Sequence, residues 1–370
     1  MKIVNQRNYG IDLLRITSMI MILILHILGQ GGILNQFNPL SLNYEMMWFL
    51  EIACFCAVNC YGLISGYVGI DKQYSYSNLI LLWLQVFYYS VLITIIFAVL
   101  NPGTVGKANF VFSLLPVFTK RYWYFSSYFA LALFIPFINK SLNKFTKNEA
   151  CILISILFVF TSVIPTFLSF GNDPFSLKSG YSAIWLLELY IIGAFIKKFG
   201  LFDNIKSKTL MLIYFIIIII SLIFKSVMDI ISINIIDSNL LIDYTSPTIF
   251  ISALCLFIVF IRLKVDFKLC NLISFFSSSA FSVYLIHTNN LVFNCLENIF
   301  IFVYKYNTLN LTLFVLSVSL LVFVILVILD KIRIFIFEKI DAKRKCQRIV
   351  SEFQIVLKKQ RFKLNNEEKT

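Results

Sequence analysis

Charged residues are scarce in this sequence, and histidine is almost absent. Only 14% of the 370 residues are charged, 59% are hydrophobic, and there are two histidines. Several apolar runs reach the length of about 20 residues that crosses a hydrocarbon core roughly 30 Å thick. The composition excludes a soluble globular protein and predicts an all-α polytopic membrane protein, because helices satisfy their own backbone hydrogen bonds in lipid.

The shortage of histidine also affects how the eight cysteines are interpreted. Most cysteines lie in the apolar segments, as Cys54, Cys56 and Cys60 do, and no histidine nearby completes a metal site. Small apolar packing residues are the simpler interpretation. We therefore expect no zinc, no disulfide framework and no bound cofactor.

The sequence also shows no cleavable signal peptide and no linker to a soluble domain. The first apolar run, Gly10–Leu28, is too long for a signal peptide, and no small-residue cleavage site closes it. We expect it to remain a membrane span. Asn101–Tyr122 is apolar but short, which is typical of a re-entrant or interfacial piece. About ten spans are expected, near residues 10–30, 45–70, 78–100, 122–138, 149–170, 181–199, 208–228, 247–263, 274–302 and 310–337.

Acidic residues are fewer than basic ones, and the net charge is +13. The expected outer segments hold few basic residues, namely Lys107, Lys120, Arg121, Lys178, Lys225 and Lys305. The inner segments and the C-terminal tail hold most of the others, so the positive-inside rule predicts both termini in the cytoplasm. An even number of spans requires the same arrangement. The positive charge is thus a topology signal. We expect no nucleic-acid partner, whereas anionic membrane lipids suit the tail.

The first span carries a cation and an imidazole. Arg15 and His26 are eleven positions apart, which is within about 20° of three full helical turns and a rise of about 16 Å. They therefore share one helix face at two depths. Because an arginine at the centre of a span costs about 3 kcal/mol on insertion scales, it normally faces a protein interior or a wet cavity. Asp12, three residues before Arg15, can offset part of this cost.

Two interpretations of this pair remain open. In the first, Arg15 holds an anionic ligand at the cytoplasmic side, and His26 acts as a base nearer the outer face. In the second, Arg15 snorkels to the inner headgroups and His26 makes a structural hydrogen bond between helices. Glu51 and Glu188 also lie inside expected spans and are site candidates. In the alternative interpretation, these glutamates pair with Arg15 or are simply protonated.

Five segments of the chain form a recognisable series. The first is Asp12-x-x-Arg15, followed after ten residues by His26. The others are Leu63–Tyr67 (LISGY), the aromatic segment from Trp123 to Asn139, Leu189–Gly193 (LYIIG) and Ser279–His287 (SAFSVYLIH). In this order, and on a plan of ten spans, the series resembles the acyltransferase-3 family of integral membrane acyltransferases over roughly residues 8–335.

The resemblance implies an O-acetyltransferase. Its donor would be cytoplasmic acetyl-CoA, and its acceptor a hydroxyl of a cell-surface polysaccharide or a lipid-linked precursor. His26 would take the hydroxyl proton, and Arg15 would anchor the donor or stabilise charge in the transition state. Asp12 would orient Arg15, or is simply a helix-start residue. Residues 1–337 would form the transmembrane domain and 338–370 a basic cytoplasmic tail of a multi-pass protein in the plasma or inner membrane.

One stretch departs from the family. Many members carry an arginine-rich segment at the start of the third span, whereas Asp71–Asn78 here offers only Lys72. Either Lys72 is the one donor-binding cation there and the donor's phosphates rest more on Arg15 and inner-loop lysines, or the donor is not the usual acetyl-CoA.

Four further residues are candidates for substrate binding. For His287, a structural hydrogen bond between spans is favoured over a contact with substrate. Tyr124, Tyr128 and Tyr190 could line a cavity with hydroxyl groups; equally, Tyr124 could belong to the aromatic belt at the outer interface.

Two other functions remain as alternatives. A flippase or transporter for lipid-linked oligosaccharide could also line a path with Arg15 and His26, but no repeat relates the two halves of the sequence. A glycan polymerase is weakened because no long, arginine-bearing outer loop is present. The sequence does not predict the acceptor sugar, the acyl chain or the oligomeric state.

Overall fold

The computed structural model describes residues 7–168, 173–231 and 237–367, and every regular element within these ranges is a helix. The chain is an all-α, polytopic membrane protein, as predicted. Among the described residues, eight helical stretches are long and apolar enough to cross a membrane. They are α1 (Tyr9–Leu28), α2 (Leu42–Phe55) with α3 (Ala57–Gly69), α4 (Tyr76–Leu100), α6 (Trp123–Leu142), α7 (Lys147–Phe158) with η3 (Val159–Leu168), α9 (Ser207–Ile231), α11 (Phe267–Ser277) with α12 (Ala280–His287), and α14 (Thr308–Lys339).

The other two expected spans also form helices, but shorter ones. They are α8 (Ala183–Phe199), of 17 residues, and α10 (Pro247–Ile261), of 15 residues. The span expected at 274–302 is displaced, because α11 begins earlier and α12 ends at His287. There Asn289 accepts a hydrogen bond from Leu291 N and starts the short helix α13 (Asn290–Asn294).

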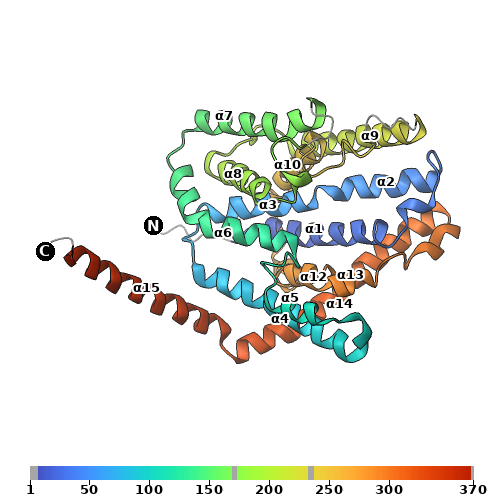
Figure 1. Cartoon of the computed structure of the whole chain (residues 1–370). Coiled ribbons are helices and arrows are strands. Elements are labelled where there is room, and N and C mark those ends of the chain that lie inside the picture. The colour runs from blue at the N-terminus through green and yellow to red at the C-terminus, as the bar shows by residue number, and fades with distance from the viewer. Residues whose placement is uncertain (1–6, 169–172, 232–236, 368–370) are drawn as a thin grey trace.

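The remaining short elements lie between spans. The segment expected to be re-entrant contains η2 (Pro102–Thr104) and α5 (Lys107–Leu114), which pack against α4. Three further 3-10 turns are η1 (Leu34–Gln36), η4 (Lys178–Gly180) and η5 (Ile301–Lys305). The last helix, α15 (Ala342–Glu367), extends away from the bundle in Figure 1.

Helix α1 lies in the middle of the bundle (Figure 1). It contacts α2, α3, α10, α11, α12 and α14, and most of its residues are buried. A helix that is apolar on all sides is expected in such a position. Asn8 caps its N-terminus by accepting hydrogen bonds from Gly10 N and Ile11 N. Asp12 and Ser18 on α1 are therefore buried, and Arg15 and His26 are partly buried.

The start of α1 and the end of α14 lie at the same end of the bundle (Figure 1). This agrees with an even number of crossings. The positive-inside rule assigns that end to the cytoplasm. Arg15 is therefore near the cytoplasmic end of α1, and His26 is near the outer end.

Two glycines bring α3 and α8 into close contact. A Cβ atom on Gly66 would lie 1.8 Å from Tyr190 O, and one on Gly193 would lie 2.1 Å from Leu63 O. Small residues at such crossings let membrane helices approach backbone to backbone, which increases their van der Waals contact. Both glycines belong to the segments that suggested the family, and their role in the fold is helix packing.

We predict that Gly193→Ala destabilises the protein. The added methyl group collides with backbone that cannot move aside, and overpacking of this kind costs about 1–3 kcal/mol. Gly103→Ala is the matched control, because no atom lies within 4 Å of its Cβ position. Thermal unfolding in detergent should give a lower midpoint for Gly193→Ala than for Gly103→Ala. Equal midpoints would contradict the assigned contact.

Candidate active site

Two cavities lie at the two ends of α1. The cytoplasmic cavity has a volume of about 450 Å³ and is lined by Arg7, Asn8, Ile11, Asp12, Arg15, Tyr67, Val68, Asp71, Lys72 and Lys197. The outer cavity has a volume of about 330 Å³ and is lined by Met19, Ile22, Leu25, His26, Val58, Tyr61, Lys120, Arg121, Tyr122, Trp123, Tyr124, Tyr181, Tyr244, Phe281, Tyr284, Thr288, Asn290 and Phe293. The structure thus separates Arg15 and His26 into different cavities on one helix.

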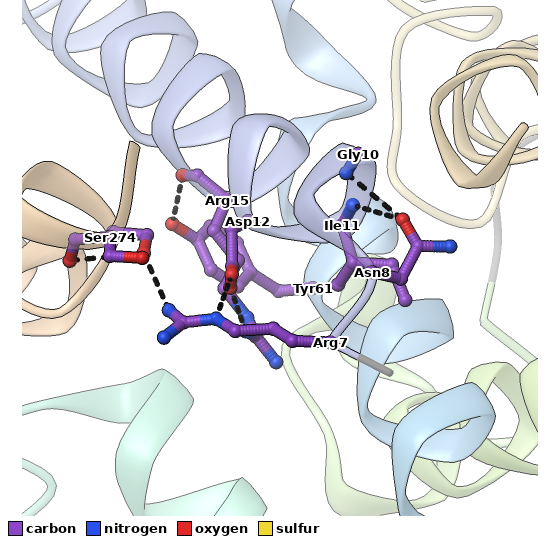
Figure 2. A network of polar contacts seen from close by, with 9 residues as sticks. Arg7, Asn8, Gly10, Ile11, Asp12, Arg15, Tyr61 and Ser274 are labelled. Carbon is purple, nitrogen blue, oxygen red and sulfur yellow. Dashed lines mark hydrogen bonds and ion pairs between the residues drawn. The ribbon is translucent and has the colours of Figure 1, made fainter. Parts of the chain in front are cut away.

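One carboxylate organises the cytoplasmic cavity. Arg15 Nη1 donates to Asp12 Oδ1 at 2.7 Å, and Arg7 Nε donates to Asp12 Oδ2 at 2.5 Å. Figure 2 shows both guanidinium groups converging on the Asp12 side chain, which is almost fully buried. Asp12 therefore positions two arginines, whereas the sequence suggested only Arg15 as its partner.

The cytoplasmic cavity carries more positive than negative charge. Arg7 and Arg15 are joined there by Lys72 and Lys197, whereas Asp12 and Asp71 are its acidic residues. The Lys197 ammonium lies 4.9 Å from the centre of the Tyr67 ring. Lys72 is thus one of four cations. The arginines and lysines together can bind an anion such as phosphate.

Tyr61 links the two cavities. Its hydroxyl donates to Arg15 O at 2.6 Å (Figure 2), and its ring lines the outer cavity. The Tyr61 and Tyr124 rings meet edge to face, with centroids 6.3 Å apart. Sequence reasoning missed Tyr61, although it lies two residues before the start of the LISGY segment.

His26 is hydrogen-bonded to the only other histidine. His287 Nε2 lies 3.0 Å from His26 Nδ1, and His287 Nδ1 lies 2.6 Å from Val283 O. The carbonyl only accepts, so His287 carries its proton on Nδ1. In a neutral ring, its Nε2 then accepts a hydrogen bond from His26 Nδ1–H. His26 Nε2 is left with a free lone pair, which is the state a general base requires.

His287 stands behind His26. It does not line the outer cavity; instead, both histidines border a separate apolar cavity of about 120 Å³. The favoured expectation for His287, a hydrogen bond between spans, agrees with this geometry. The edge of the Phe293 ring packs against His26 at a centroid distance of 5.0 Å.

Of the three candidate tyrosines, Tyr124 lines the outer cavity, whereas Tyr128 and Tyr190 line neither of the two cavities. Tyr128 stacks on Tyr124 with nearly parallel rings, 6.4 Å between centroids. Tyr190 is fully buried, and its hydroxyl donates to Asn139 Oδ1 at 2.8 Å. Asn139 in turn donates to Gly69 O. Tyr190 therefore joins α3, α6 and α8 through hydrogen bonds.

Glu51 and Glu188 are buried and line neither cavity. Glu188 accepts a hydrogen bond from the Thr161 hydroxyl at 2.7 Å. Among the described residues, Asp12 is the acidic partner of Arg15, and neither glutamate forms an ion pair with it. The apolar pattern of the sequence placed both carboxyl groups within membrane spans, but it does not indicate which neighbouring helices their side chains face.

Several lining residues were absent from the sequence-based candidates. Arg121 and Tyr122 line the outer cavity from the turn before α6, Trp123 from the first residue of α6, and Tyr284 from α12. The Tyr284 hydroxyl accepts from Tyr124 N at 3.3 Å. Arg121 and Tyr122 directly precede the aromatic segment, Trp123 begins it, and Tyr284 lies in SAFSVYLIH. The two segments were thus the sequence features that pointed to these residues.

The family model for the acyltransferase domain of acyltransferase-3 proteins matches residues 8–330. The chain belongs to the acyltransferase-3 family. The match begins at the cap of α1 and includes most of α14, so it covers the elements that line both cavities. Neither a curated protein nor a solved structure matches the chain. An acyltransferase-3 protein with these spans is a membrane acyltransferase, and the match gives no support to the flippase or polymerase alternatives.

The hydrogen bonds around His26 predict one tautomer for each histidine. The chain has two histidines, so nitrogen-15 NMR of histidine-labelled protein without a histidine tag should resolve both rings. We expect each ring to be protonated at Nδ1 and bare at Nε2 near neutral pH. Removing the acceptor in His287→Leu should abolish the fixed Nδ1–H state of His26. A His26 ring that carries its proton on Nε2 in the unsubstituted protein would refute the assignment.

Proposed function

We propose that this acyltransferase moves an acetyl group from acetyl-CoA to a hydroxyl of a cell-surface polysaccharide or of its lipid-linked precursor, as a multi-pass protein of the plasma or inner membrane. The observation that carries the proposal is the pair of cavities on α1. A cationic cavity opens around Arg15, and an aromatic one opens around His26.

The cytoplasmic cavity suits the donor. Coenzyme A carries several phosphate oxygens, and a planar guanidinium binds phosphate through paired hydrogen bonds. Arg7 and Lys197 supply charge that the third-span segment lacks, so the weak cationic character of Asp71–Asn78 no longer argues against coenzyme A. Arg15 and Lys72 are the sequence-based donor-binding residues that line this cavity. The distance of about 16 Å along α1 is one that an extended pantetheine arm can span.

The outer cavity suits a saccharide and the chemistry of transfer. Its walls are mostly aromatic, and several rings bear hydroxyl groups, so they offer apolar faces and hydrogen-bonding groups to a sugar. His26 Nε2 takes the proton of the acceptor hydroxyl as the oxygen attacks the thioester carbonyl. The new C–O bond forms, the C–S bond breaks, and the imidazolium returns the proton to the departing thiolate.

We expect His26→Ala to abolish transfer. Loss of a general base typically lowers the rate by about 10²–10⁴-fold. Proton NMR of the surface glycan, before and after mild alkali, should show O-acetyl signals in cells with the intact gene. The signals should be lost in a deletion strain and in His26→Ala at equal membrane expression. His287→Gln should reduce the signals less than His26→Ala does, because it leaves the base in place. Changed glycan length with unchanged acetylation would refute the proposal.

We expect Arg15→Gln to weaken donor binding. A hydrogen bond to a charged group contributes about 1.5–3 kcal/mol, which corresponds to an increase of roughly ten- to a hundredfold in the KM for acetyl-CoA. Arg262→Gln is the matched control. Arg262 donates to Phe202 O and Ile205 O and lines neither cavity. Steady-state kinetics in detergent should show the increase for Arg15→Gln alone. A lower kcat with an unchanged KM would instead place Arg15 in the chemical step.

A further inference from the structure

The outer cavity carries positive charge without acidic residues to balance it. Lys120 and Arg121 both line this cavity, and no Asp or Glu does so within the described parts of the chain. The cytoplasmic cavity differs in this respect, because Asp12 and Asp71 line it together with its cations. An electropositive cavity of this kind attracts anions.

Arg121 is buried, and its partners are all neutral. Only 7% of its surface is exposed. Its Nη2 donates to the Thr94 hydroxyl at 2.9 Å and more weakly to Asn289 Oδ1 at 3.4 Å, and its Nη1 donates to Asn109 O at 3.2 Å. Its Nε has no partner among the described residues. Burial lowers the pKa of the Arg121 guanidinium, as expected for a desolvated cation.

The other buried arginine shows what Arg121 lacks. Arg333 donates through two nitrogens to the carboxylate of Asp330, at 2.8 Å each. Burying a charge is costly unless an opposite charge compensates it. If Arg121 only fastened the turn before α6 to its neighbours, a neutral amide could make the same hydrogen bonds. An uncompensated guanidinium beside a cavity indicates that the counter-charge arrives with a ligand.

We propose that the outer cavity binds an anionic saccharide, with Arg121 contacting the carboxylate or phosphate group of the acceptor. Lys120 adds charge at the same cavity, and the aromatic walls contact the sugar rings. This inference rests on the proposed function in taking the outer cavity as the acceptor site. In the proposed function the phosphates of the donor bind elsewhere, in the cytoplasmic cavity around Arg15, which lies about 16 Å along α1 from His26.

Asn289 makes the proposal testable by a near-isosteric change. Its Oδ1 lies 3.4 Å from Arg121 Nη2, and its Nδ2 donates to the Tyr122 hydroxyl at 2.8 Å. In Asn289→Asp, a carboxylate would face Arg121 and could accept from Tyr122. The variant supplies the missing counter-charge from within the protein. It should fold at least as stably as the unsubstituted chain while losing its affinity for an external anion.

In the experiment, each probe is titrated into the full chain in phosphatidylcholine nanodiscs. Saturation-transfer difference NMR measures its binding. The probes are methyl β-glucuronide, glucose 1-phosphate and the neutral methyl β-glucoside. We expect at least one anionic probe to bind about ten-fold more tightly than the glucoside, as one charge-assisted hydrogen bond would give. Preference for the glucuronide points to an acidic sugar, and preference for the sugar phosphate points to a phosphorylated or lipid-linked acceptor.

Variants decide whether Arg121 causes the preference. In Arg121→Gln and Asn289→Asp the anionic and neutral probes should bind within about two-fold of each other, whereas Arg121→Lys should keep part of the preference. Lys305→Gln, which removes an outer cation that does not line the cavity, should keep all of it. Equal binding of the three probes, or a preference that survives Asn289→Asp, would overturn the proposal.

The same titration separates this inference from the proposed function. His26→Ala should lose acetyl transfer and retain the preference for the anionic probe. Anion preference without acetyl transfer by the unsubstituted protein would refute the proposed reaction and leave the anion site standing. Acetyl transfer without anion preference would refute the anion site alone.

Discussion

A polar group inside a hydrocarbon layer needs a partner, and this constraint decides what surrounds α1. The helix is mostly buried, so the cation and the imidazole it carries face protein and the two cavities. Asp12 compensates Arg15 from within the same helix, and His287 from α12 holds the inner nitrogen of His26. Unpaired polar groups at this depth are expensive. The pairing thus fixes which atoms remain free for a ligand.

The two cavities differ in how the charge of their arginines is compensated. At the cytoplasmic end, Arg7 and Arg15 share the carboxylate of Asp12. Each guanidinium therefore keeps N–H groups that can donate to a phosphate, and its charge is compensated when no ligand is bound. At the outer end, Arg121 contacts only neutral groups. The first arrangement suits a donor that binds and leaves in every cycle. The second makes occupation of the cavity by an anion more favourable, because the protein provides no competing carboxylate.

The sequence alone predicted the parts of the site that are local in the chain. The spacing of Asp12, Arg15 and His26 follows from helix geometry, and the structure retains it. The contact between His26 and His287 joins residues 261 positions apart, and no periodicity could predict such a pairing. Glu51 and Glu188 were recognised as unusual for membrane spans, but their side chains face the packed interior. Which way a buried side chain points depends on neighbouring helices, and a single sequence does not contain their arrangement.

One short segment, residues 287–293, contacts both Arg121, which is proposed to bind the acceptor, and His26, which is proposed to act as base. His287 ends α12 and holds His26, and Asn289, two residues later, contacts both Arg121 and Tyr122. Asn289 also caps α13, whose Phe293 packs against the His26 ring. A hydrogen bond thus joins Arg121 to Asn289, and the Phe293 ring of the helix that Asn289 caps contacts the imidazole of His26. Residues 287–293 therefore supply both the hydrogen-bond partner of His26 and a neutral partner of Arg121, so one short segment contacts groups at two sides of the outer cavity.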